Sequence, residues 1–210
     1  KKARKIFRAF FCVYNFPPLC QSREGVVERS ETGGESENIL IFKLTLFVWV
    51  FVLTNGKIHI YTDGAASGNP GPGGYGIVML FNQHRKEVSE GFRLTTNNRM
   101  ELLSVIEALR LIKNKEYEVI VHSDSKYVVD AINLKWIDNW IKIGFKNKAN
   151  VDLWLQFLEV YNPNKMRFVW VKGHASNKEN NRCDELAVAA YKQKNLKIDE
   201  GYEASKGELL

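Results

Sequence analysis

The stretch 57–74 constrains the fold more than any other part of the chain. Within it, residues 58–63 alternate between apolar or small side chains on one face and polar or aromatic ones on the other, as a half-buried β-strand requires. Asp63 comes last before a segment rich in Gly, Pro, Ser and Asn, which we expect to end the strand. A carboxylate in this position either caps its own turn or belongs to a site.

The composition is that of a globular protein with a net positive charge. Hydrophobic residues make up 45% of the 210-residue chain and charged residues 26%, which suits a packed core. The net charge of +6 weakly favours a partner such as nucleic acid. The three cysteines (Cys12, Cys20 and Cys183) form no CxxC pair, which argues against a disulfide framework or a zinc site. We therefore expect a reducing compartment and a cytoplasmic location.

Residues 1–56 differ in character from the rest of the chain, and we treat them as an N-terminal extension of unknown role. The polar segment 22–38 is predicted to be disordered. The apolar run 39–53 has 15 residues, fewer than the roughly 20 that a membrane helix needs. Three interpretations stay open: upstream sequence joined by a mis-set start, an unusual anchor, or an added structural element.

Residues 57–195 read as alternating strands and helices. Apolar runs at 75–81 and 88–94 lie close together and predict an antiparallel meander with the first strand. Helical periodicity then sets in over 98–113. Further strands are predicted at 119–124 and 166–171, and further helices at 125–134, 150–161 and 180–195. This order predicts an α/β domain with some parallel pairing, followed by a loose polar tail at 196–210.

Four carboxylates lie at the edges of these predicted elements. Asp63 and Asp124 stand at strand ends, and Glu101 and Asp184 in the first turns of helices. Clustered carboxylates repel one another unless a cation lies between them, and hard cations such as Mg²⁺ prefer oxygen ligands. Two such ions about 3.5–4 Å apart can promote phosphodiester cleavage. The spacing alone does not show convergence, and the helix dipole is a plainer explanation for Glu101.

Four blocks of sequence resemble bacterial ribonuclease HI, the type 1 ribonuclease H family. They are Tyr-Thr-Asp-Gly-Ala-Ala-Ser-Gly-Asn-Pro-Gly-Pro-Gly-Gly (61–74), Thr-Thr-Asn-Asn-Arg-Met-Glu-Leu (95–102), His-Ser-Asp-Ser-Lys-Tyr-Val (122–128), and Val-Lys-Gly-His-Ala (171–175) with Asn-Arg-Cys-Asp-Glu-Leu-Ala (181–187). The resemblance runs from about Lys57 to Lys194. It implies the ribonuclease H-like fold, a mixed sheet of five strands (three antiparallel, the others parallel) flanked by helices, over a catalytic domain at 57–195.

The resemblance also implies an activity and its residues. The family hydrolyses the RNA strand of RNA–DNA hybrids with two Mg²⁺ ions, for which Mn²⁺ can substitute, and leaves 3′-hydroxyl and 5′-phosphate ends. By motif match, Asp63, Glu101, Asp124 and Asp184 are the expected metal ligands and catalytic residues. His174 is expected to assist proton transfer or product release. The implied partner is the hybrid duplex, bound by a monomer with no obligatory protein partner and no firm membrane association.

Two groups of residues are expected to bind the hybrid, by the same resemblance. The first lies in the two polar loops beside the carboxylates and comprises Asn69, Thr96, Asn97 and Asn98. The second lies in a basic, aromatic protrusion at 135–148 and comprises Trp140, Lys142, Lys146 and Lys148. Lysine contacts to phosphate would give salt-sensitive binding without sequence preference. Trp136 is assigned to the core, and Ile141 and Ile143 depart from a more basic family pattern.

Other functions remain as alternatives. A ribonuclease H domain of a retroelement reverse transcriptase would share the motifs, but the basic protrusion argues against it. A non-catalytic hybrid-binding module on the same fold would have no need of four adjacent carboxylates. A membrane-tethered protein rests only on the apolar run 39–53.

Overall fold

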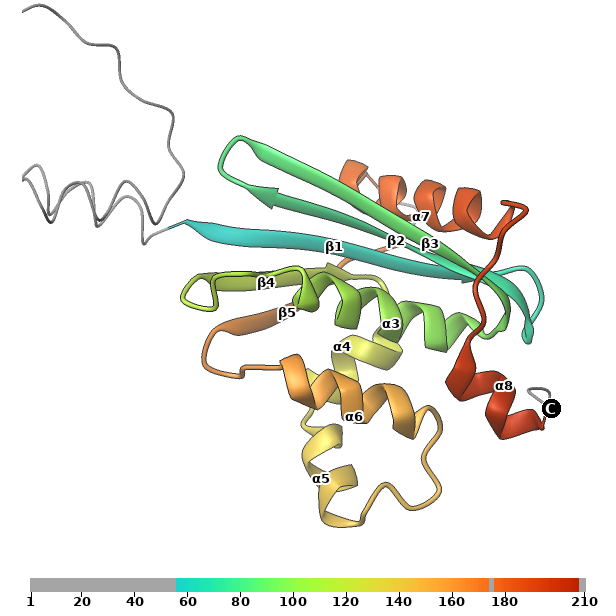
Figure 1. The fold of residues 1–210 in the computed structure, drawn as a ribbon. Helices are drawn as coiled ribbons and strands as arrows, with labels where there is room; N and C mark the ends of the chain where they lie inside the picture. The colour runs from blue at the N-terminus through green and yellow to red at the C-terminus, as the bar shows by residue number, and fades with distance from the viewer. Residues whose placement is uncertain (1–55, 174–175, 208–210) are drawn as a thin grey trace, which may run out of the picture. The chain divides into compact units, whose positions relative to one another are not determined.

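The computed structural model describes residues 56–173 and 176–207, which form a five-stranded sheet flanked by helices (Figure 1). The strands are β1 (Lys57–Ala66), β2 (Gly71–Phe81), β3 (His84–Thr95), β4 (Glu118–Ser123) and β5 (Met166–Trp170). The helices are α3 (Asn97–Arg110), α4 (Lys126–Asn133), α5 (Trp136–Lys142), α6 (Val151–Val160), α7 (Lys178–Tyr191) and α8 (Glu200–Lys206). The predicted fold class is confirmed.

Some predictions concern residues outside this description. His174 belongs to the undescribed pair 174–175, and the N-terminal extension 1–56 is outside as well, except for Gly56. The apolar run 39–53 therefore lies outside too, and with it the interpretation as an anchor. Within the described ranges, no helix has both the length and the apolar composition that crossing a bilayer requires.

The sheet order is β3-β2-β1-β4-β5, with β1 at the centre. β1 pairs antiparallel with β2 and parallel with β4, and β4 pairs parallel with β5, as the meander and the helix crossovers predict. The β1–β4 ladder ends where Thr62 pairs with Ser123. Asp63 and Asp124 are the next residues of the two segments, so both carboxylates leave the parallel ladder at the same level.

The first strand does not end at Asp63, contrary to the prediction. β1 continues to Ala66, and its pairing with β2 reaches as far as Gly73. The glycines of β2 leave room for α7, which lies directly on the strand. A Cβ added at Gly76 would lie 2.1 Å from the carbonyl oxygen of Cys183 in α7. The glycines after Asp63 therefore serve close helix–sheet packing as well as the turn.

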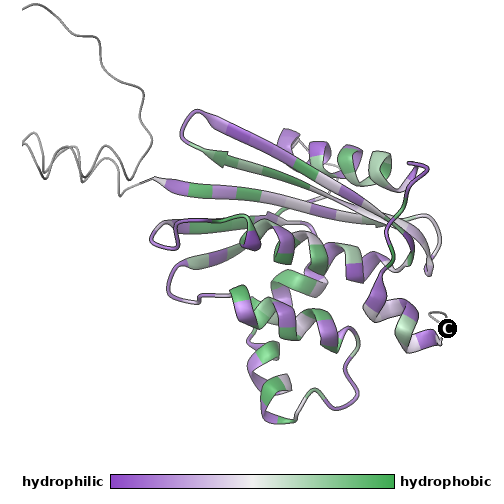
Figure 2. Cartoon of the chain, in the orientation of Figure 1, coloured by the Kyte–Doolittle hydropathy of each residue, from purple (hydrophilic) through white to green (hydrophobic). Residues whose placement is uncertain are grey.

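The hydrophobic core lies between the central strands and the helices. Figure 2 shows β2 as mostly hydrophobic and the edge strand β3 as mostly hydrophilic. Fully buried side chains come from β1, β2, α3 and α6, among them Ile60, Ile77, Met100 and Trp154. Removing such side chains from water supplies most of the stabilisation that holds the helices on the sheet.

The basic protrusion comprises α5 and the loop to α6, and it extends from the body on the side away from β3 (Figure 1). Trp136 is 42% exposed there, so its assignment to the core is wrong, and Ile137 is buried in its place. Lys135 precedes the helix in a left-handed conformation (φ 57°). This turn sets which face of α5 meets the body, and hydrophobicity alone does not reveal it.

The segment after Leu196 is not the loose tail that its polarity predicts. The backbone of Lys197 hydrogen-bonds to Gly91 and Arg93 of β3, at 2.8 and 2.9 Å. The helix α8 follows, and Asp199 and Glu203 are buried at 6% and 1% exposure. Glu203 forms an ion pair with Arg93. Acidic residues can be buried in this way when they are paired with arginine.

Candidate active site

The central strand places Asp63 beside two helices. Asp63 pairs with Gly76, and both residues face the side of the sheet that α7 covers. The next residue, Gly64, faces α3: a Cβ added there would lie 2.2 Å from the backbone nitrogen of Glu101. Only glycine permits this approach. The Asp63 side chain therefore lies on the face that α7 covers. Gly64, the next residue, brings the backbone of β1 close to Glu101 of α3.

Glu101 is held by hydrogen bonds to both of its carboxylate oxygens. The Asn97 amide donates to Oε1 at 2.9 Å from one turn earlier in α3. The Ser125 hydroxyl donates to Oε2 at 2.5 Å from the start of α4. Ser125 also caps α4, because its Oγ accepts from the Val128 N–H. The same serine therefore fixes both the helix after Asp124 and the orientation of Glu101.

Asp124 is fixed from two further elements. The indole Nε1 of Trp170, at the end of β5, donates to the backbone oxygen of Asp124 at 3.0 Å. The side-chain amide of Asn180 in α7 donates to Asp124 Oδ2 at 3.2 Å. Asp124 thus lies where β4, β5 and α7 meet, and its carboxylate is linked to the helix that carries Asp184.

The pKa values of Asp63 and Glu101 are raised by burial and by neighbouring carboxylates. Burial, followed by the charges of Asp124, Asp184 and Glu101, raises the pKa of Asp63 to about 8, although the Gly64 N–H opposes the shift. Burial and the charge of Asp124 raise the pKa of Glu101 to about 7, against the lowering effect of the Ser125 hydrogen bond. Buried negative charges that disfavour each other in this way call for a cation.

The carboxylates of the two helices are not in first turns, contrary to the prediction. α3 begins at Asn97 and has no acidic residue in its first turn, so Glu101 lies one turn further along. α7 begins at Lys178, which places Asp184 in its second turn. The helix dipole acts mainly within the first turn, so it does not account for Glu101. Both helices begin earlier than predicted, because their first residues are polar and resemble a loop.

The donor set suits a hydrated hard cation. In the described part of the chain, no three His, Cys, Asp or Glu side chains form a ready cage for a metal ion. Mg²⁺ does not need such a cage, because it keeps several waters and uses one or two carboxylates per ion. Asp63, Glu101, Asp124 and Asp184 offer only oxygen, the donor that Mg²⁺ and Mn²⁺ prefer. The residues present therefore fit a divalent cation.

The first group of predicted hybrid-binding residues gathers at the start of α3. Asn69 accepts a hydrogen bond from the backbone N–H of Asn97 through its Oδ1, at 3.3 Å. Thr96 occupies the cap position of α3 without a side-chain capping bond, and Asn98 is exposed. Asn97 has a second role that the sequence did not reveal, because its amide holds Glu101.

The second group lies on the basic protrusion, apart from the carboxylates. Lys142 and Lys146 are exposed, and Lys148 Nζ lies 5.2 Å from the ring centroid of Trp140. Trp140 is half-buried and packs edge-on against Trp154 of α6, with 5.3 Å between ring centroids. The indole thus anchors the protrusion while it stacks beneath a lysine.

Three site residues were missed from the sequence: Ser125, Trp170 and Asn180. Ser125 follows Asp124 directly and has the residue type of a helix cap, which is a readable signal. Asn180 precedes Asp184 by one helical turn, so the two share a face of α7, and that spacing was available too. Trp170 gave no signal, because its contact depends on the pairing of β5 with β4.

Comparison with known proteins agrees with this geometry. The RNase H family model matches residues 55–192. The chain belongs to the RNase H family. It is 51% identical over 151 residues to the ribonuclease H of Syntrophus aciditrophicus, and this alignment covers 70% of this chain and 87% of that protein. It is 54% identical over 148 residues to the ribonuclease H of Desulforamulus reducens, covering 68% and 92%.

A solved RNase H structure shares the fold. LC9-RNase H1, described as a type 1 RNase H with the type 2 active-site motif, aligns with a TM-score of 0.59 and 32% identity, covering 74% of this chain and 82% of that one. The predicted membership of the bacterial RNase H family and the predicted enzyme class are confirmed. As an RNase H, the chain is a nuclease that hydrolyses the RNA strand of RNA–DNA hybrids, in a family that uses divalent metal ions.

Proposed function

We propose that this RNase H cuts its RNA strand with two Mg²⁺ ions held by Asp63, Glu101, Asp124 and Asp184, and leaves 3′-hydroxyl and 5′-phosphate ends. The observation that carries the proposal is that Asp63 and Asp124 follow the last pair of the β1–β4 ladder, where Gly64 brings β1 against Glu101. Bound cations at such a site would activate water and stabilise charge on the leaving oxygen. Mn²⁺ has the same preference for oxygen and would substitute.

The residues of this chain have distinct parts in that reaction. Asp63 and Asp124, which follow the last pair of the β1–β4 ladder, would provide the central ligands. Glu101 would lie near the RNA 2′-hydroxyl, and its two hydrogen bonds keep the carboxylate in one orientation. Asp184 would hold the second ion. His174 would assist proton transfer or product release, as the sequence motif implies.

The hybrid would lie across the start of α3 and reach the basic protrusion. Asn69, Asn97, Asn98 and Thr96 offer amide and hydroxyl groups beside the carboxylates, suited to base edges, the 2′-hydroxyl and phosphate. The exposed lysines of the protrusion would bind phosphate without reading sequence. We propose the cytoplasm as the location, supported by the buried Cys183, which forms no disulfide.

Cleavage of an end-labelled RNA–DNA hybrid tests this function. The parent should cut the RNA strand only when Mg²⁺ or Mn²⁺ is present and leave duplex DNA and duplex RNA intact. Asp63→Asn should lose activity by more than about a hundredfold, as expected when a group that stabilises the transition state is removed. Glu200→Gln is the matched control, since it removes an exposed carboxylate of α8 and should cut like the parent.

Two results would contradict the proposal. One is hybrid binding without cleavage over a wide range of Mg²⁺ and Mn²⁺ concentrations. The other is unchanged cleavage by Asp63→Asn, which would place the chemistry elsewhere. Analysis of the product ends tests the predicted 3′-hydroxyl and 5′-phosphate separately.

A further inference from the structure

Asn180 is buried deep in the site, at 1% exposure, although it belongs to a helix whose outer face is charged. Its amide nitrogen donates to Asp124 Oδ2 at 3.2 Å. Burial of an amide costs free energy unless the amide is hydrogen-bonded, so its hydrogen bonds need to be identified. The motifs that indicate metal ligands do not account for Asn180.

The orientation of the Asn180 side chain follows from chemistry. A carboxylate only accepts hydrogen bonds, so the NH₂ group, and not the carbonyl oxygen, must face Asp124. The Asn180 Oδ1 atom is then buried, and the described residues provide no hydrogen-bond partner for it. A water molecule is the usual partner of such an oxygen, and waters accompany a hydrated cation. The side chain thus has one group on a carboxylate and one without a protein partner.

Asn180 also belongs to the helix that carries Asp184. The two residues are four positions apart, so they lie one above the other on the same face of α7. A hydrogen bond from Asn180 to Asp124 therefore links β4 to the Asp184 segment of α7. Among the described residues, it is the hydrogen bond that joins the Asp124 carboxylate to that helix.

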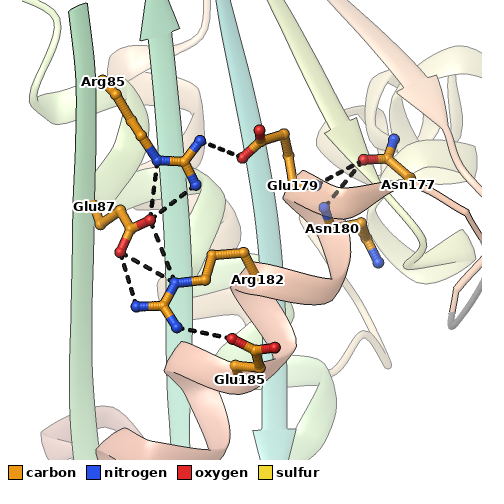
Figure 3. A network of polar contacts seen from close by, with 7 residues as sticks. All are labelled: Arg85, Glu87, Asn177, Glu179, Asn180, Arg182 and Glu185. Carbon is orange, nitrogen blue, oxygen red and sulfur yellow. Dashed lines mark hydrogen bonds and ion pairs between the residues drawn. The ribbon is translucent and has the colours of Figure 1, made fainter.

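The start of α7 is itself held firmly against β3. Figure 3 shows Arg182 reaching Glu87 of β3, with hydrogen bonds of 3.1 to 3.3 Å, and Arg85 pairing with Glu179. Asn177 caps the helix by accepting from the backbone N–H groups of Glu179 and Asn180. These contacts fix the backbone from which Asn180 extends, so its amide is presented to Asp124 in a defined place.

We propose that Asn180 is a positioning residue that holds Asp124 in register with Asp184 for divalent-cation binding. The inference rests on the proposed function, because it concerns the same cations. Hydrogen-bond partners of metal-binding carboxylates orient them, and loss of one such partner weakens metal affinity or activity by about 10- to 100-fold. Asn180 acts through Asp124 and need not touch the substrate.

Cation binding by Asn180→Leu tests the proposal. Leucine has the same number of side-chain heavy atoms in the same branched arrangement, and it removes the donor. Calorimetric titration of the hybrid-free protein with Mn²⁺ should show an affinity at least about tenfold weaker than that of the parent. The kcat at low Mg²⁺ should fall and recover as Mg²⁺ rises, while the KM for the hybrid stays unchanged. A merely structural role would not produce that recovery.

Arg182→Gln is the matched control. Arg182 lies two residues further along α7, and its loss removes the ion pairs with Glu87 and Glu185 without touching Asp124. The variant weakens the anchoring of α7, yet Mn²⁺ affinity should stay within twofold of the parent. A drop equal to that of Asn180→Leu would show that helix anchoring, and not the amide, sets the affinity, and would overturn the proposal.

A second measurement uses the unmodified protein, so it does not depend on a variant that folds. The side-chain NH₂ resonance of Asn180 should shift during an Mg²⁺ titration with the same dissociation constant that calorimetry gives for Mg²⁺. An unshifted resonance at saturation overturns the proposal, as does a folded Asn180→Leu protein with parental Mn²⁺ affinity. If the parent itself binds no divalent cation, the proposed function fails first, which separates the two failures.

Discussion

Arg99 donates two parallel hydrogen bonds of 2.7 Å to Asp199, and both side chains are almost fully buried. The same guanidinium binds both oxygens of Asp152, at 2.9 and 2.7 Å. One arginine at the start of α3 therefore joins the start of α6 to the residue that caps α8. Bidentate pairs of this kind are the strongest that arginine forms with carboxylates.

Asp199→Ala should lower the free energy of unfolding by about 3–5 kcal/mol, the usual cost of removing one partner from a buried ion pair. The substitution also leaves the Thr95 hydroxyl without its acceptor, which now lies 2.6 Å away. Urea unfolding measures the effect. The neighbouring exposed residue provides the control, because Glu200→Ala should change stability by less than about 0.5 kcal/mol. An equal loss of unfolding free energy in both variants would show that the buried ion pair does not account for the destabilisation.

The stabilising effect of Asp152 should disappear in acid. Burial raises the pKa of Asp152, but the hydrogen bonds and charge of Arg99, together with backbone N–H groups at the start of α6, hold the pKa below its ordinary value. A carboxyl whose pKa is lower in the folded state stabilises above its unfolded pKa of about 3.9, and this contribution is lost as the pH falls through the folded value. Asp152→Asn should therefore be less stable than the parent near neutral pH.

Unfolding curves of the parent and of Asp152→Asn over a pH series give the measurement. The difference in unfolding free energy between the two proteins should shrink as the pH drops below about 4. A difference that stays constant down to the most acidic folded sample would mean that Asp152 does not titrate with a lowered pKa.

Gly64→Ala should impair both stability and activity. The added methyl group would lie 2.2 Å from the backbone nitrogen of Glu101, so β1 and α3 must separate. Overpacking of this kind costs about 1–3 kcal/mol. The separation also moves Asp63 away from Glu101, so kcat should fall even where the protein remains folded. Thermal unfolding and hybrid cleavage check the two effects, and parental values in both would contradict the close approach.

The lysines of the basic protrusion should affect substrate affinity and leave the chemical step alone. Replacing Lys142 and Lys146 together with alanine should raise the KM for the hybrid, keep kcat unchanged, and reduce the salt dependence of binding by about two phosphate contacts. Replacing the exposed pair Lys192 and Lys194, just after α7, is the control and should leave KM unchanged. Equal effects from both pairs would indicate general charge attraction and no specific protrusion contact.

Local pattern was enough to predict how the strands pair. Alternation in β1 and the short turns gave the meander, and the strand–helix order gave parallel pairing at β4 and β5. Carboxylates at element edges were visible as well, and the family resemblance joined them into one site. Their actual place depended on packing that no window of sequence contains, such as the approach of Gly64 to Glu101.

The polar elements were harder to predict because their partners are far away in sequence. Asp199 and Glu203 read as solvent-exposed until Arg99 and Arg93 are placed beside them, 100 and 110 residues apart. Trp136 read as core because its size favours burial, whereas the backbone turn at Lys135 buried Ile137. In both cases the deciding information lies in tertiary contact and backbone geometry, and not in local hydrophobicity.

The order of synthesis determines when Arg99 can form its ion pairs with Asp152 and Asp199. Arg99 leaves the ribosome 100 residues before Asp199. At about 5–20 residues per second, that interval is about 5 to 20 seconds. During that time the start of α3 carries an arginine whose buried partner, Asp199, has not yet been made. The nascent domain should therefore reach its final stability, and a settled position for Asn97 and Glu101, only when α8 emerges.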